Sequence, residues 1–207
     1  MSAAGLILAA GESSRMGSPK ALLRYRGQTF LDTLISLLAA RCSPVIVVLG
    51  ANADEIRRGL SWSAAPNTLF EAAPHTAPHA TFVINPDYRI GQTSSMQCGL
   101  RAVPASAEGV LFTLADHPAV AASTIDALAA QPRPLIRVPR FEGRRGHPVW
   151  FSRALIAEFL ALPAHAAARD VVYRHADETE YLDVNDPGIV ADIDDPAAYR
   201  ELIGAEA

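Results

Sequence analysis

The first candidate for chemistry is a loop that carries two glycines and two cations directly after an apolar run. It reads Leu8-Ala-Ala-Gly-Glu-Ser-Ser-Arg-Met-Gly-Ser-Pro-Lys20, with glycines at Gly11 and Gly17 and cations at Arg15 and Lys20. Glycine lets the backbone approach a ligand without a Cβ in the way, and free N–H groups beside cations bind phosphate. The spacing matches neither GxxxxGK[ST] nor GxGxxG. Phosphate binding and an ordinary glycine turn with solvated charges are therefore both open interpretations.

Two carboxylate motifs follow further along the chain. Asp116 belongs to Leu-Ala-Asp-His-Pro at the end of another apolar run, and Asp192, Asp194 and Asp195 lie in Asp-Ile-Asp-Asp-Pro. Ligands of parallel sheets bind beyond the C-terminal strand ends, so Asp116 could hold Mg²⁺, which takes one or two carboxylates together with phosphate oxygens. If a strand continued through the second motif, Asp192 and Asp194 would share one face. Each of these residues could instead cap a turn or a helix.

Two further segments carry polar groups suited to ligands. Gly91-Gln-Thr-Ser-Ser-Met96 precedes a helical pattern, and its hydroxyls and amide could bind a base or a ribose, or simply cap that helix. Phe141-Glu-Gly-Arg-Arg-Gly-His-Pro-Val-Trp-Phe151 holds two glycines and two arginines. These could recognise an anionic second substrate or form a solvated hairpin turn.

Short apolar runs alternate with helical patterns, and this alternation predicts the elements that position the motifs. Strands alternating with helices indicate βαβ units and an α/β fold with a mainly parallel sheet and helices on both faces. Asn52 is a candidate N-cap, and Ser61–Ala80 reads as a long connection. The predicted strands are Gly5–Ala10, Pro44–Gly50, Thr81–Asn85, Val110–Ala115, Leu135–Pro139 and Ile189–Ile193. The predicted helices are Phe30–Leu38, Asn52–Leu60, Ser95–Ala102, Ser123–Ala130, Ser152–Leu162, Ala168–His175 and one that begins at Pro196.

Composition excludes several classes of protein. The 207 residues predict a single domain over residues 1–207, and 50% hydrophobic content excludes a disordered chain. A net charge of −4 argues against nucleic-acid binding, and no apolar run is long enough to span a bilayer. Cys42 and Cys98 form no CxxC motif, so we expect a cytoplasmic protein. The 18 basic residues are 17 arginines and one lysine, Lys20.

Taken together, the motifs resemble a family of nucleotidyltransferases that includes molybdenum cofactor cytidylyltransferase and the related guanylyltransferase. The opening signature of that family, LAAGxSxRMGxPKxLL, is matched from Leu8 to Leu23 at every fixed position. The chain also shows a family-like GxxSSxxxGL segment, the ADHP strand end, the RGHPVWF segment and the terminal DIDDPAAY. The resemblance covers nearly the whole chain and implies a Rossmann-like fold of the nucleotide-diphospho-sugar transferase type.

The resemblance implies a Mg²⁺-dependent transfer of a nucleotidyl group from a nucleoside triphosphate to a phosphate, with release of pyrophosphate. It gives Arg15 and Lys20 catalytic contacts to the phosphates. Asp116 becomes a catalytic metal ligand, with Asp194 favoured over Asp192 as the second. Arg145 and His147 lie toward the acceptor. The implied nucleotide-binding residues are Leu8, Ala9, Ala10, Gly11, Gly17, Gly91, Ser94 and Ser95.

The choice of substrates rests on finer details. Ala10, in LAAG, resembles the branch that uses CTP, and the implied acceptor is a molybdopterin-type cofactor, with a molybdenum hydroxylase apoenzyme as a possible protein partner. The family commonly carries Gly-Asp-x-Gly-Ala-Arg where this chain has Pro163-Ala-His-Ala-Ala-Ala-Arg169. A sugar phosphate or another phosphorylated metabolite therefore stays open as the acceptor. A non-catalytic cofactor carrier is a further alternative, and an oxidoreductase ranks last because GxGxxG is absent.

Overall fold

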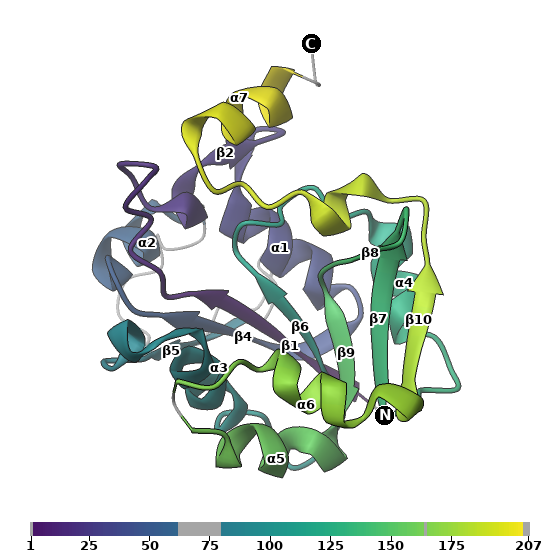
Figure 1. Cartoon of the computed structure of the whole chain (residues 1–207). Helices are drawn as coiled ribbons and strands as arrows, with labels where there is room; N and C mark the ends of the chain where they lie inside the picture. Colours follow the sequence, from purple (N-terminus) through teal and green to yellow (C-terminus); the bar gives the residue numbers. More distant parts are fainter. Residues whose placement is uncertain (1, 62–79, 164, 205–207) are drawn as a thin grey trace.

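The protein, seen here in a computed structural model, is built around one mixed sheet that helices cover on both sides (Figure 1). The structure describes residues 2–61, 80–163 and 165–204. Seven strands follow the order β10-β7-β9-β6-β1-β4-β5, and β8 pairs with β7. Their bounds are β1 Ser2–Ala9, β4 Cys42–Leu49, β5 Ala80–Ile84, β6 Ala107–Leu114, β7 Ile136–Phe141, β8 Arg144–Arg145, β9 Val149–Ser152 and β10 Thr179–Asp183. A separate hairpin consists of β2 Arg24–Tyr25 and β3 Gln28–Thr29.

The central strands are apolar because both of their faces are covered. β1 pairs in parallel with β4 and β6, and β4 pairs in parallel with β5. The residues of β4 from Val45 to Leu49 are all buried, which explains a continuous rather than alternating apolar run. β9 runs antiparallel between β6 and β7, and β10 is parallel to β7. The predicted α/β fold with a mainly parallel sheet is confirmed.

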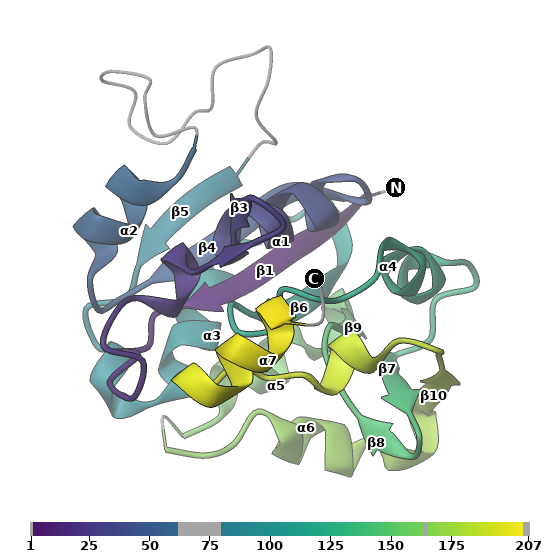
Figure 2. The ribbon, with the colours of Figure 1, turned by 90° about the horizontal axis from the view of Figure 1, so that it is seen from above.

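Two apolar cores lie on opposite faces of the sheet. α1 and α4 pack on one face through residues such as Leu34 and Leu128, while α3, α5 and α6 pack on the other through residues such as Leu100 and Phe159. Figure 2 shows the two groups of helices on either side of the strands. The bounds are α1 Phe30–Ala39, α2 Ala53–Gly59, α3 Gln92–Leu100, α4 Ala122–Ala129, α5 Ile156–Ala161, α6 Arg169–Arg174 and α7 Pro196–Gly204. Short 3₁₀ turns are η1 Lys20–Leu22, η2 Tyr88–Ile90, η3 Arg153–Leu155, η4 Ala176–Glu178 and η5 Pro187–Val190.

The predicted strand Ile189–Ile193 is wrong. Its first half is the 3₁₀ turn η5, in which Asp186 accepts a hydrogen bond from the Gly188 N–H, and its second half has no regular structure. The segment bonds to loops instead of a strand: Ile189 O accepts from His147 N at 2.9 Å, and Ile193 N donates to Asp116 O at 3.0 Å. The last sheet strand is β10, which sequence periodicity did not reveal.

Two smaller predictions have mixed outcomes. Asn52 occupies the N-cap position of α2 in a left-handed conformation, but its side chain makes no capping hydrogen bond. The predicted connection Ser61–Ala80 falls almost entirely on residues 62–79, which lie outside the described residues. Within the described ranges, no helix has the length and apolar character needed to cross a membrane.

Candidate active site

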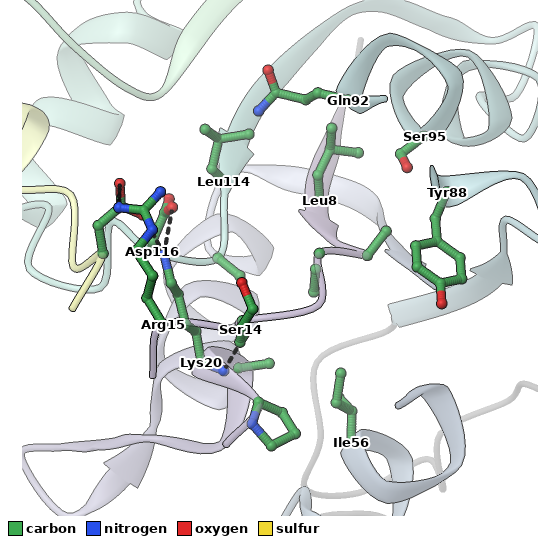
Figure 3. Close-up of a pocket in the computed structure, with 18 residues that line it drawn as sticks. Leu8, Ser14, Arg15, Lys20, Ile56, Tyr88, Gln92, Ser95, Leu114 and Asp116 are labelled. Carbon is green, nitrogen blue, oxygen red and sulfur yellow. Dashed lines mark hydrogen bonds and ion pairs between the residues drawn. The ribbon is translucent and has the colours of Figure 1, made fainter. Parts of the chain in front are cut away.

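A cavity of about 290 Å³ opens at the C-terminal ends of β1 and β6, where ligands of parallel sheets bind. Figure 3 shows Arg15, Lys20 and Asp116 gathered on one side of it, opposite Tyr88 and Ile56. The cavity is lined by Leu8, Ala9, Ala10, Gly11, Ser13, Ser14, Arg15, Pro19, Lys20, Ala21, Ile56, Tyr88, Gln92, Ser95, Leu114, Ala115, Asp116 and Asp194.

The loop after β1 is shaped by its small residues. Gly17 has a φ of 74°, a left-handed conformation that glycine adopts without strain, and Ser13 takes a φ of 52°. The Ser13 carbonyl accepts from Met16 N at 2.9 Å, and the Ser13 hydroxyl oxygen accepts from Lys20 N at 3.0 Å. The loop therefore closes on itself and delivers Lys20 to the cavity at the start of η1. A Cβ on Gly11 would meet no atom within 4 Å, so this backbone borders open space.

Lys20 lies between two carboxylates that are distant in sequence. Its Nζ donates to Asp194 Oδ1 and is 3.5 Å from Asp116 Oδ2. The Lys20 side chain is only 16% exposed, whereas Arg15, which contacts Asp194 Oδ2 at 3.4 Å, is 71% exposed. The hydrogen bond from Lys20 lowers the pKa of Asp194, and the charges of Lys20 and Arg15 act in the same direction. Asp194 is therefore ionised and faces a largely buried ammonium and an exposed guanidinium.

An apolar cluster and a hydrogen bond hold the segment around Asp194 in this place. Ile193 is buried with Tyr25 and Phe30, and the hydroxyl of Tyr199 on α7 donates to Arg24 O at 2.9 Å. The adjacent Ile193 N bonds to the carbonyl of Asp116 itself. This backbone hydrogen bond holds the Asp116 and Asp194 carboxylates near each other.

The carboxylate pair fits a divalent cation that completes its shell with phosphate oxygens. Asp116 Oδ1 is buried and has no hydrogen-bond partner among the described residues, so one acceptor oxygen remains available. His117 Nε2 lies 3.7 Å from that oxygen, but burial lowers the pKa of His117 and opposes its charged form. In the described part of the chain, no group of three or more His, Cys, Asp or Glu side chains has an arrangement that could hold a metal ion. Two carboxylates without further protein donors suit Mg²⁺-type ligation with phosphate.

A network behind α3 fixes the other wall of the cavity. The buried Asn85 follows β5, and its Nδ2 donates to both Ser94 Oγ and Ser95 Oγ at 3.0 Å. Its Oδ1 accepts from Asp87 N at 3.0 Å. Ser95 is therefore held at the cavity, whereas the Ser94 hydroxyl bonds to the carbonyls of Asp87 and Gly91.

Tyr88 closes this wall and packs on Gly50 at the end of β4. A Cβ on Gly50 would lie 2.6 Å from Tyr88 Cβ and 2.7 Å from Ala10 O. Only glycine at position 50 therefore leaves room for both the Tyr88 side chain and the Ala10 carbonyl. The Gln92 amide was among the groups that the sequence offered for binding, whereas sequence reasoning missed Tyr88 and Ile56 as lining residues. Their position just after strands β4 and β5 was the available signal.

The residues predicted from the sequence lie mostly in two cavities, the first of which is the one just described. The cavity gathers Leu8, Ala9, Ala10, Gly11, Arg15, Lys20, Ser95, Asp116 and Asp194, whereas Gly17, Gly91 and Ser94 are not among its lining residues. Asp192 is exposed and makes no contact with Lys20 among the described interactions.

Arg145 and His147 line a second cavity, of about 500 Å³, which also touches Gln92. Arg145 lies on β8 in the predicted hairpin, with its guanidinium over the rings of Tyr173 and Tyr181. Loss of solvation, together with the charge of His117, lowers the pKa of His147 to about 3, so its ring is neutral at pH 7. The two histidine rings lie 5.1 Å apart and connect the second cavity to the Asp116 loop.

An α/β sheet with a cation-bearing loop after its first strand and paired carboxylates beside it can bind phosphates together with a divalent cation. A nucleotidyl transferase from Methanothermobacter shares the fold, with a TM-score of 0.78 at 19% identity, covering 99% of this chain and 97% of that one. Residues 5–179 match the model of the MobA-like NTP transferase domain. The chain belongs to this family and is a nucleotidyltransferase.

Relatives with similarity over the whole chain carry different names. Nicotine blue oxidoreductase of Paenarthrobacter nicotinovorans is 30% identical over 92% of this chain and 91% of its own length. Molybdenum cofactor cytidylyltransferase of Escherichia coli is 25% identical over 92% and 90%. The crystal structure of Rv0371c from Mycobacterium tuberculosis has a TM-score of 0.78 at 27% identity, with 99% of both chains covered, and a further structure of that protein is a complex with manganese.

Proposed function

We propose that this nucleotidyltransferase transfers CMP from CTP to the phosphate of a molybdopterin-type acceptor and releases pyrophosphate. The observation that carries the proposal is the cluster of Lys20, Asp116 and Asp194 at the end of the glycine loop. It combines a point cation for phosphates with two ionisable carboxylates at the position where parallel sheets bind nucleotides. The matching relative named molybdenum cofactor cytidylyltransferase supports the choice of nucleotide and acceptor.

Asp116 and Asp194 are the residues that would hold Mg²⁺, and the unpartnered Asp116 Oδ1 supports this assignment. When bound, the ion supplies positive charge that neutralises the phosphate oxygens. The Lys20 ammonium, on its flexible stem, would contact the phosphates bound beside the two carboxylates. Arg15 is exposed and, among the described residues, pairs with Asp194, so it would contact the triphosphate from the solvent side.

The reaction needs positioning and charge stabilisation more than acid–base chemistry. An oxygen of the acceptor phosphate bonds to the α-phosphorus of CTP, the bond from that phosphorus to the bridging oxygen breaks, and pyrophosphate leaves with the electron pair. Lys20 and Arg15 stabilise the charge that develops on the departing group. The acceptor phosphate is already ionised near pH 7, so no general base is required.

Ala10 lies in the wall of the cavity and is the residue whose type, in the LAAG opening, resembles the branch that uses CTP. Ala10 is buried, and its carbonyl accepts from Ala51 N at 3.1 Å. The nucleotide part of the proposal rests on this resemblance and on the relative named molybdenum cofactor cytidylyltransferase.

The test is pyrophosphate release from CTP in the presence of Mg²⁺ and molybdopterin, measured with a coupled colorimetric assay. We expect turnover with CTP, loss of turnover when EDTA removes the metal, and loss in Asp116→Asn. Turnover with GTP in place of CTP would contradict the nucleotide assignment. An absence of turnover with all four nucleoside triphosphates, given the same acceptor, would contradict the proposed reaction.

A further inference from the structure

Both oxygens of the Asp194 carboxylate face a cation of the chain. Asp194 Oδ1 accepts a hydrogen bond from Lys20 Nζ, and Asp194 Oδ2 lies 3.4 Å from Arg15 Nη1. The same Lys20 Nζ lies 3.5 Å from Asp116 Oδ2 (Figure 3). The Lys20 ammonium therefore lies between the two carboxylates that are proposed to hold a divalent cation.

A divalent cation and the Lys20 ammonium compete for the same oxygens. An ion held by both carboxylates must contact an oxygen of Asp194, and each of these oxygens already faces Lys20 or Arg15. An ammonium carries only donors and cannot itself ligate a metal. At contact distance in a partly buried site, the two cations also repel each other. The space between the carboxylates therefore takes the ammonium or the divalent cation, but not both.

Lys20 is the stronger of the two competing cations of the chain. Its side chain is largely buried, and its backbone N donates to Ser13 Oγ at 3.0 Å, which fixes the point from which the side chain extends. Burial strengthens the attraction between the ammonium and the carboxylates relative to a pair in water. Arg15 is mostly exposed, so its ion pair with Asp194 is weak.

A chain of phosphates provides other partners for this ammonium. Lys20, Arg15 and the backbone of Gly11 all line the nucleotide cavity, so a bound triphosphate meets both cations. Its anionic oxygens replace those of Asp116 and Asp194 as acceptors for the Lys20 ammonium. Phosphate oxygens also complete the shell of a divalent cation. The nucleotide thus frees the carboxylates and supplies further ligands in one event.

We infer that Lys20 sets the order of binding at this site, because its ammonium competes with divalent cations for the carboxylates until the phosphates of a nucleotide bind. Coupling of this kind is reciprocal, so the nucleotide strengthens metal binding by the same factor as the metal strengthens nucleotide binding. The inference rests on the proposed metal pair of Asp116 and Asp194. It does not depend on the choice of CTP or of the acceptor.

The experiment is a calorimetric titration of the full chain with MnCl₂ alone, since Mn²⁺ prefers the same oxygen ligands as Mg²⁺. Lys20→Met should bind Mn²⁺ at least tenfold more tightly than the wild type, because the competing charge is gone. If Lys20 only supported the fold, its loss would loosen the site and weaken the metal. Equal or weaker Mn²⁺ binding in Lys20→Met would overturn the inference.

Two further variants control for net charge and place the ion. Arg101→Met removes an exposed cation at the end of α3, roughly 13 Å along that helix from Gln92 at the cavity, and should leave Mn²⁺ affinity unchanged. The double variant Lys20→Met/Asp194→Asn should lose the gained affinity. If the double variant keeps it, the ion binds elsewhere and the inference is wrong.

Thermal unfolding covers the case in which Lys20→Met folds poorly. Removal of the ammonium leaves two carboxylates facing each other, so the Tm of Lys20→Met should fall in EDTA and recover with MnCl₂. Lys20→Gln, which keeps N–H donors but no charge, should show the same recovery. A rise in Tm with MnCl₂ that is no larger in these variants than in the wild type would contradict the competition.

A CTP titration distinguishes failure of this inference from failure of the proposed function. Binding of CTP to the wild type, without any gain of Mn²⁺ affinity in Lys20→Met, would contradict only the order of binding. A gain of Mn²⁺ affinity in Lys20→Met, without CTP binding to the wild type, would support the competition at Lys20 and contradict the proposed reaction.

Discussion

Replacing the single lysine of the chain by arginine tests the role of the point charge at Lys20. Arginine keeps the positive charge but spreads it over a larger planar group with a different donor geometry. The Lys20 ammonium lies in a space that leaves its side chain 16% exposed, in contact with Asp194 and 3.5 Å from Asp116 Oδ2. A guanidinium cannot occupy this point without moving the centre of charge.

The magnitude follows from the distances. At an effective dielectric constant of about 20, two unit charges separated by the 3.5 Å of Lys20 Nζ and Asp116 Oδ2 interact by roughly 5 kcal/mol. A shift of about 2 Å reduces this to roughly 3 kcal/mol. The same loss at a phosphate oxygen in the transition state is slightly more than the ~1.4 kcal/mol that corresponds to a factor of ten in rate. We therefore expect Lys20→Arg to lower kcat at least tenfold.

Steady-state pyrophosphate release gives kcat, and thermal unfolding shows that the fold is intact. Lys20→Met, which removes the charge, should cost about 100-fold or more, as for the loss of one charge-stabilising donor. Arg200→Met removes a cation from the exposed surface of α7 and should leave kcat unchanged. If Lys20→Arg keeps at least half of the wild-type kcat with an unchanged Tm, the argument for a point charge is refuted.

Three further predictions concern the surroundings of the site. Asp194→Asn should reduce turnover and apparent Mg²⁺ affinity by roughly 10- to 100-fold. The control is Asp195→Asn, which should have almost no effect on either quantity, because the Asp195 side chain caps Ala197 N and Ala198 N. Similar losses in both variants would exclude a specific role for Asp194. Gly50→Ala should lower the free energy of unfolding by about 1–3 kcal/mol, because the added Cβ would lie 2.6 Å from Tyr88 Cβ. The same contact should weaken nucleotide binding measured by calorimetry. Unchanged affinity would show that Tyr88 does not shape the cavity. The ring nitrogens of His175 lie 2.9 Å from carboxylate oxygens of Glu178 and Glu158, and these hydrogen bonds raise the pKa of His175. The protonated ring therefore stabilises the fold fully below the unfolded pKa of about 6.5. This stabilisation is lost as the pH rises through the higher folded pKa. A scan of Tm against pH should lose this slope in His175→Gln but not in the exposed control His165→Gln, and an unchanged slope in His175→Gln would contradict the assignment.

The sheet was predictable where burial is two-sided. Val45–Leu49 reads as a strand because every side chain there is buried and apolar, and β1 and β6 contain similar buried apolar runs at 3–9 and 110–112. β10 has side chains that are exposed or only partly buried, and its sequence, Thr-Glu-Tyr-Leu-Asp, carries no continuous apolar run. Edge strands of this kind are defined by their neighbour, here β7, so local pattern does not reveal them.

The candidate site was predictable in its parts but not in its assembly. Arg15, Lys20 and Asp116 stand out because cations and a carboxylate follow apolar strands. The strand on which Asp192 and Asp194 would share one face does not form, so the pattern of the sequence could not distinguish them. Asp194 reaches Lys20 because Ile193 is anchored in an apolar cluster and bonds to the Asp116 backbone, which are tertiary contacts. Tyr88 depends in the same way on a glycine 38 positions earlier, Gly50.

The most direct test of the account is thermal unfolding with CTP, GTP, UTP or ATP in the presence of Mg²⁺. A ligand at about 100 times its Kd adds ~2.7 kcal/mol, which for a chain of this size raises Tm by roughly 5–10 °C. We predict this rise with CTP and Mg²⁺, little or none with GTP, and its loss in Asp116→Asn. A larger rise with GTP would contradict the assignment of CTP. An unchanged Tm with all four nucleotides would contradict the central claim that the Lys20, Asp116 and Asp194 cluster binds a nucleoside triphosphate.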